Sequence, residues 1–217
     1  MFAQLHEVLG TAPVAFVLLL VVVDPFGLAP MFSALTAGRT AAERRRIAVR
    51  AVLIAAGVIA FFIFGGGWLL DYLGVGMPAF RIAGGVLLFL IAMDLLLVRH
   101  SGLSSATEQE QIEAAQRADI AVFPLAIPMI AGPGTLTTVM LLTHAQGILA
   151  DLLILFLSLA VLAITLAMFL TAPRVERMLG ETGINVISRL LGLLLAALAV
   201  QFVLDGLRAS LPGLAAP

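Results

Sequence analysis

Residues 18–36 read LLLVVVDPFGLAPMFSALT, an apolar run interrupted in its middle by an acid, two prolines and a glycine. A helix needs about 20 predominantly apolar residues to cross the hydrocarbon core of a membrane. Proline donates no N–H and displaces the preceding residue from helical geometry, and glycine permits an unwound backbone. The stretch therefore predicts a membrane-spanning helix that is broken near Asp24, Pro25, Gly27 and Pro30.

The composition of the whole chain indicates a membrane protein. It has 217 residues, of which 62% are hydrophobic and 12% charged, and its mean hydropathy is +1.14. A soluble domain is about half apolar and about a quarter charged. A net charge of −1 offers no electrostatic footprint for nucleic acid, and the lack of cysteine excludes disulfides and thiolate metal sites. The expected partner is the lipid bilayer, with no nucleic acid, no cofactor and no removable signal peptide.

Six apolar stretches have the length of membrane spans, and the first and fourth also contain proline and glycine. They cover residues 12–37, 48–70, 79–98, 119–145, 150–171 and 186–207. Except for Arg81 and Arg208, every arginine falls on one side of the resulting topology. The positive-inside rule then places both termini outside and the Arg-rich loops in the cytoplasm. We therefore expect an all-α polytopic membrane protein.

The chain also shows an internal repeat. A shift of 107 residues brings GLAPMFSALT (27–36) onto GTLTTVMLLT (134–143), and a shift of 108 brings Arg81 and Gly84 onto Arg189 and Gly192. We predict a three-span repeat in residues 1–98, a polar cytoplasmic linker in 99–118 that includes a short helix from about Thr107, and a second repeat in 119–217. Because three is odd, the second repeat must be inverted. Inverted repeats with broken helices are typical of secondary transporters.

The fourth span contains a second break, in PLAIPMIAGPG (124–134). Irregular backbone is tolerated at membrane depth only inside protein or beside a water-filled cavity. We expect free N–H groups and a partial positive charge at Gly27–Leu28 and at Gly134–Thr135, where half-helices begin. Free carbonyls are expected near Val23 and Ile130. The predicted substrate-binding residues are Asp24, Pro25, Phe26, Gly27, Leu28, Ala131, Gly132, Pro133, Gly134, Thr135 and Thr138.

Asp24 is the one acid in the middle of a span, where a carboxylate is costly. Two interpretations coexist. Asp24 either contacts a substrate ammonium or carries a proton, or it caps the half-helix that follows. The hydroxyls of Thr135, Thr137 and Thr138 likewise either line the site or bond back to the preceding turn.

Motifs of enzymes are missing from the sequence. The three histidines are isolated, and there is neither a His-Glu-x-x-His helix nor a Gly-x-Ser-x-Gly elbow. We therefore do not expect an enzyme.

Three segments together resemble the MarC family of bacterial and archaeal membrane proteins. They are DPFGLAPMFSALT (24–36), PLAIPMIAGPGTLTTV (124–139) and RLLGLLLAALAVQFVLDGL (189–207). The resemblance implies six spans in two inverted repeats and a location in the bacterial plasma (inner) membrane. It also implies transport of small neutral amino acids such as glycine or alanine. Leu28 replaces the asparagine usual in that family, and Thr135 stands where alanine is common, so the substrate can differ.

The resulting hypothesis is a secondary transporter of small neutral amino acids that works by alternating access. Coupling to protons and coupling to sodium are both compatible with the sequence, and so are import and export. The alternatives are an exporter or channel for another small solute, or a non-transporting membrane scaffold.

Overall fold

The computed structural model describes residues 2–97, 119–143 and 147–211, and within these ranges the chain forms helices and no strand. Five helical segments are long and apolar enough to cross a membrane, and a bent pair of helices makes the sixth span. The elements are α1 (Phe2–Val23), α2 (Pro25–Leu35), α3 (Ala41–Leu73), α4 (Met77–Leu97), η1 (Ala121–Ile130), α6 (Pro133–Thr143) and α7 (Ile148–Ser210). The six predicted spans are therefore confirmed. The predicted helix near Thr107 and most of the 99–118 linker lie outside the described residues.

Local sequence explains where the long helices begin and turn. Thr40 caps α3 through a capping box, in which Thr40 Oγ1 accepts from Glu43 N–H and Glu43 Oε2 accepts from Thr40 N–H at 2.8 Å. The helix therefore starts about two turns before the expected span at residue 48. Within α7, Gly180 has φ 62°, which glycine adopts without steric cost, and the chain reverses there. We call Ile148–Val175 the first arm of α7 and Thr182–Ser210 the second arm.

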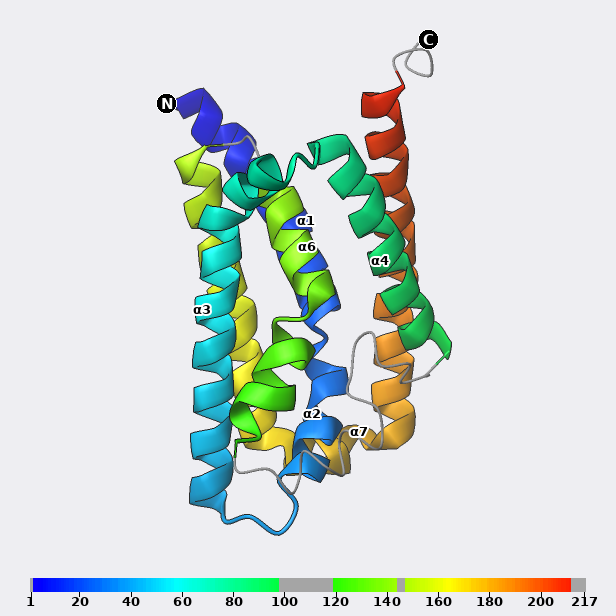
Figure 1. Ribbon diagram of the computed structural model, residues 1–217. Coiled ribbons are helices and arrows are strands. Elements are labelled where there is room, and N and C mark those ends of the chain that lie inside the picture. The colour runs from blue at the N-terminus through cyan, green and yellow to red at the C-terminus, as the bar shows by residue number, and fades with distance from the viewer. Residues whose placement is uncertain (1, 98–118, 144–146, 212–217) are drawn as a thin grey trace.

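The two sets of three spans run in opposite directions (Figure 1). From the end that holds the N-terminus, α1 and α2 descend, α3 returns and α4 descends again. The second set starts at the far end: η1 and α6 ascend, the first arm of α7 descends, and the second arm ascends to the C-terminal end. The predicted inverted repeat is therefore confirmed, and the third helices of the two repeats, α4 and the second arm of α7, lie side by side (Figure 1).

Contacts between these third helices are reciprocal. A Cβ built on Gly85 would lie 2.7 Å from the Ala199 carbonyl oxygen, and one built on Gly192 would lie 3.1 Å from the Ala92 carbonyl oxygen. Gly192 follows Gly85 by 107 residues, and Ala199 follows Ala92 by the same number. Each contact is therefore the image of the other under one two-fold operation. The shift of 108 that pairs Gly84 with Gly192 is thus one residue too large for these helices.

The same offset relates a pair of threonines in the two half-helices. Thr36 Oγ1 donates to the Phe32 carbonyl at 2.7 Å, and Thr143 Oγ1 donates to the Val139 carbonyl at 2.8 Å. Each hydroxyl bonds back to the carbonyl four residues earlier in its half-helix, and the Phe32 carbonyl also accepts from the Thr36 N–H at 3.0 Å. Local hydrogen bonding therefore repeats along with the helix directions.

Between the repeats lies an apolar core. Within it the Phe32 and Phe169 rings stack at 4.4 Å between centroids, and Arg44 lies over the Phe32 ring at 5.7 Å. Large apolar side chains elsewhere, such as Phe61 and Phe156, are exposed on the outside of the bundle. In a membrane these outer faces contact lipid tails, so exposure carries no hydrophobic cost.

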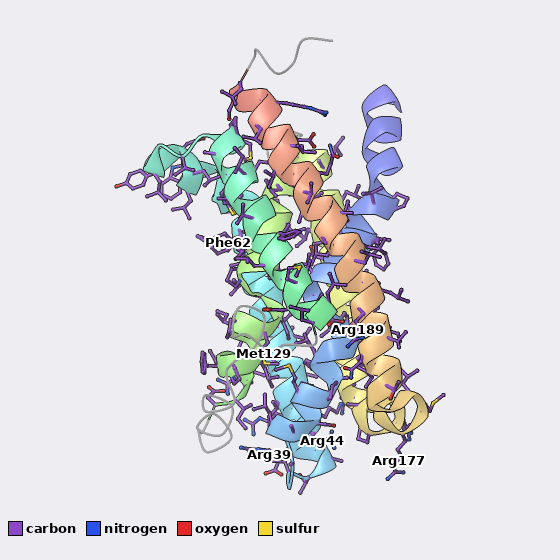
Figure 2. All side chains as sticks on the ribbon, turned by 90° about the vertical axis from the view of Figure 1, so that its right-hand side faces the viewer. Arg39, Arg44, Phe62, Met129, Arg177 and Arg189 are labelled. Atoms are coloured by element: carbon purple, nitrogen blue, oxygen red, sulfur yellow. The ribbon has the colours of Figure 1, made fainter. Side chains whose placement is uncertain are left out.

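The two ends of the bundle differ in chemistry. Arg39, Arg44 and Arg177 gather at the end opposite the chain termini (Figure 2). At the other end of α3 the Trp68 and Tyr72 rings stack at 5.6 Å and are 68% and 76% exposed. Tryptophan and tyrosine favour the membrane–water interface. The ring pair therefore marks the interface on the side of the termini.

Candidate functional site

The first span is interrupted by a single residue, Asp24. Its backbone is left-handed, with φ 45° and ψ 66°, and it separates α1 from α2 without a large bend. The left-handed region is uncommon for residues other than glycine, although aspartate and asparagine are enriched there. Pro30 was also expected to break the span, but it lies inside α2, because one missing N–H removes only one hydrogen bond.

The Asp24 side chain caps α2. Its Oδ1 accepts from Gly27 N–H at 3.1 Å, and the Asp24 carbonyl accepts from Leu28 N–H at 3.0 Å. A Cβ on Gly27 would overlap the carboxylate, so glycine is required for this approach. The expectation of free N–H groups at Gly27–Leu28 is therefore wrong. The capping interpretation is confirmed, and it leaves the second carboxylate oxygen for another partner.

That partner comes from the opposite repeat. Ser188, on the second arm of α7, directs its Oγ toward Asp24 Oδ2 at 3.4 Å, and both side chains are only 8% exposed. Ser188 was not among the predicted site residues. Its one signal in the sequence is its position beside Arg189, at the point where the arginine motif of the repeat begins.

The second break is wider than the first. In η1 the backbone is extended at Phe123 and Ile127, the residues before Pro124 and Pro128. Proline sterics produce this conformation, as expected. A 52° bend then separates η1 from α6, and a Cβ on Gly132 at the bend would overlap the Pro128 carbonyl oxygen. The fourth span is therefore discontinuous, as predicted.

The first turn of α6 lacks a carboxylate equivalent to Asp24. Leu136 N–H donates to the Gly132 carbonyl at 3.0 Å, which parallels the bond from Leu28 to Asp24. Pro133 has no N–H, so the remaining first-turn donors are the N–H groups of Gly134 and Thr135. The Thr135 hydroxyl donates to the Ile130 carbonyl at 2.9 Å, so it bonds back to the chain. The two half-helices thus begin in similar ways but carry different charges.

Thr138 lies one turn further along α6. The residue is 0% exposed, and its hydroxyl has no hydrogen-bond partner within the described part of the chain. The Cα–Cβ bond of a helical residue tilts toward the N-terminus of its helix, so the Thr138 side chain lies over the turn that holds Gly134. A buried unpaired hydroxyl costs about 1–3 kcal/mol. The Thr138 hydroxyl is therefore available to form a hydrogen bond with a bound ligand.

The two breaks meet inside the bundle. A Cβ on Gly134 would lie 3.3 Å from Val22 Cγ1 and 2.5 Å from Ile91 Cδ1, so the start of α6 packs against the last turn of α1 and against α4. Figure 1 shows both breaks at a similar level along α3. The structure thus packs the break at Gly134 against the turn of α1 that leads into Asp24.

The charge at this junction is unbalanced. None of the described arginines forms an ion pair with Asp24; the ion pairs lie elsewhere, as between Arg50 and Asp119 at 2.8 Å. Among the described residues no three His, Cys, Asp or Glu side chains gather in a way that could hold a metal ion. The site therefore holds one carboxylate, a serine hydroxyl and the ends of broken helices.

Comparison with known proteins gives one consistent result. The profile of the MarC family integral membrane proteins matches residues 11–211. The membrane protein YvbG of Bacillus subtilis is 38% identical over 198 residues, covering 91% of this chain and 94% of YvbG. A membrane protein of Aquifex aeolicus is 39% identical, and the match covers 89% of this chain and 91% of the Aquifex protein. The inner membrane protein YhgN of Escherichia coli is 36% identical, and the match covers 96% of this chain and 100% of YhgN. No solved structure matches the chain.

Proposed function

Because this chain belongs to the MarC family of integral membrane proteins, we propose that it is a secondary transporter of small neutral amino acids, of the glycine and alanine class. The observation that carries the proposal is the meeting of two helix breaks, one from each inverted repeat, inside a multi-pass bundle. Paired broken helices of this kind bind substrate near the membrane midplane in many secondary transporters.

The two breaks suit the two charges of a zwitterion. The substrate carboxylate binds the N–H groups of Gly134 and Thr135 with the Thr138 hydroxyl, because the equivalent end of α2 already holds the Asp24 carboxylate. The ammonium group binds on the side of Asp24. The orientation of the bound substrate thus follows from Asp24, the acid that the second repeat lacks.

The small residues at the junction support a small substrate. Gly27 and Gly132 admit a carboxylate and a carbonyl where any Cβ would overlap them, and Ala131, beside Gly132 in the chain, is almost fully buried. Alternating access would then proceed by rocking of one repeat against the other. The close contact between α4 and the second arm of α7 is suited to act as the pivot. The Arg-rich end would face the cytoplasm.

The test is flux in proteoliposomes that contain the purified full chain. Labelled glycine and alanine should enter with saturable kinetics and be stimulated by unlabelled amino acid on the opposite side. Asp24→Asn should lower the rate strongly, and Thr138→Val should raise KM. Asp151→Asn, at the start of the first arm of α7, is the matched control. Gly134→Val would mainly disturb packing, since Ile91 occupies the space of a Cβ.

Two results would reject the proposal. Absence of saturable flux for any small amino acid would favour a scaffold without transport activity. Flux that neither saturates nor shows counterflow stimulation would favour a channel.

A further inference from the structure

Capping α2 uses one of the two oxygens of Asp24. The other oxygen, Oδ2, has the Ser188 hydroxyl at 3.4 Å, which is long for an O–H···O⁻ hydrogen bond. No described arginine pairs with the carboxylate. Buried charges in proteins are normally paired with an opposite charge or coordinate a cation. When Asp24 is ionised, Oδ2 therefore carries negative charge that no described side chain balances.

The end of α1 adds further oxygen atoms at the same break. The Val21 carbonyl would normally accept from residue 25, but Pro25 has no N–H. The Val23 carbonyl would normally accept from Gly27, whose N–H instead donates to Asp24 Oδ1. Carbonyls at a helix C-terminus point along the axis out of the helix and carry partial negative charge. The last turn of α1 thus points its oxygens toward the residue that holds the carboxylate.

We propose that Asp24 Oδ2, Ser188 Oγ and the terminal carbonyls of α1 bind a monovalent cation, which is either a sodium ion or the ammonium group of the transported solute. All these ligands are oxygens, as hard cations and ammonium groups prefer. One carboxylate balances a single positive charge, so a divalent ion would remain uncompensated. The ammonium form rests on the transport function proposed above, whereas the sodium form does not.

Ser188 gives the site its link between the repeats. Asp24 and α1 belong to the first repeat, and Ser188 lies 164 residues away on the last helix of the second. A cation held by both would stabilise the arrangement in which the second arm of α7 lies against the break. Occupancy of the site would therefore favour one conformation over the other.

The experiment measures the thermal stability of the purified full chain in detergent during titration with ligands. Sodium chloride is compared with choline chloride at equal ionic strength. Glycine, glycinamide and acetate are then titrated in choline buffer; glycinamide keeps the ammonium group and lacks the carboxylate, and acetate does the reverse. A ligand that binds the folded state raises the melting temperature.

Three variants locate the site. Asp24→Asn keeps a good N-cap residue that tolerates the left-handed backbone, so it should fold but lose the cation-dependent shift. Ser188→Ala should weaken the apparent affinity about tenfold or more, as expected for a lost hydrogen bond to a charged group. Ser158→Ala is the matched control, because Ser158 is also a buried serine of α7 and makes no hydrogen bond with Asp24.

Each outcome is decisive. A saturable sodium shift that depends on Asp24 and Ser188 identifies an alkali-ion site, even in a protein that shows no amino acid flux. A shift with glycine and glycinamide, but not with sodium or acetate, identifies an ammonium site. If no cation gives a shift that Asp24→Asn abolishes, or if Ser188→Ala binds like Ser158→Ala, the proposed site is wrong.

Discussion

Replacing Gly85 by alanine should loosen the contact between α4 and the second arm of α7. The new Cβ would lie 2.7 Å from the Ala199 carbonyl oxygen and 3.0 Å from the Val203 nitrogen. Both are backbone atoms, so no rotamer change can relieve the overlap and the helices must separate. Overpacking of this kind costs about 1–3 kcal/mol. Alanine regains about 0.5–1 kcal/mol from its higher helix propensity.

The matched control is Gly57→Ala on α3, where a Cβ would meet nothing within 4 Å. This variant gains the propensity term alone, so the two variants should differ by about 1–3 kcal/mol in the free energy of unfolding. In a chain of this size each kcal/mol shifts the melting temperature by about 2–4 °C. Gly192→Ala should fall between them, because its nearest backbone atom is the Ala92 carbonyl oxygen at 3.1 Å.

Thermal unfolding followed by far-UV circular dichroism in detergent would measure the order of these three variants. Gly85→Ala should melt lowest and Gly57→Ala highest. If Gly85→Ala melts with or above Gly57→Ala, the third helices do not pack at backbone distance, and the two-fold contact described above is incorrect.

Three further predictions concern the site and the topology. Thr138→Val should raise the melting temperature of the ligand-free protein, because it removes a buried unpaired hydroxyl worth about 1–3 kcal/mol, while Thr138→Ser should not. The free energy of unfolding of Asp24→Ala should be about 0.5–2 kcal/mol lower than that of Asp24→Asn, measured by the same unfolding assay, because alanine cannot cap α2. Since the chain has no cysteine, Arg39→Cys and Val75→Cys can each be labelled alone; in intact cells an impermeant maleimide should label only Val75→Cys, and the opposite pattern would reverse the proposed orientation.

Backbone chemistry made much of the fold predictable from the sequence. Apolar length predicted the spans. Proline close to glycine predicted both interruptions, because proline lacks an N–H donor and glycine permits an unwound backbone, whereas Pro30 alone did not end α2. The odd number of spans in each repeat then required inversion. The extended conformations at Phe123 and Ile127 follow directly from the prolines after them.

Three features could not be predicted from the sequence: the Asp24 cap, the Ser188 contact and the offset of the third helices. They depend on competition between acceptors for one N–H donor, or on contacts between distant parts of the chain. Proline and glycine indicate that N–H groups lose their helical partners, but they do not indicate that the Asp24 carboxylate takes the one on Gly27. Ser188 is an ordinary small residue in an apolar helix until folding brings it to Asp24. The offset of 108 failed at the third helices because similar apolar residues align equally well one position away, and only the contacts of Gly85 and Gly192 distinguish the registers.

The exposed aromatic pair at the end of α3 makes the protein its own spectroscopic probe. Trp68 is the single tryptophan of the chain, so all indole fluorescence arises from one place. Its emission wavelength reports the polarity at that end of the bundle, and quenching by lipids brominated at different acyl positions would measure its depth. The stacked Tyr72 lies close enough to transfer excitation energy to it. The position of this protein in a bilayer can therefore be read from the unmodified chain, without a label.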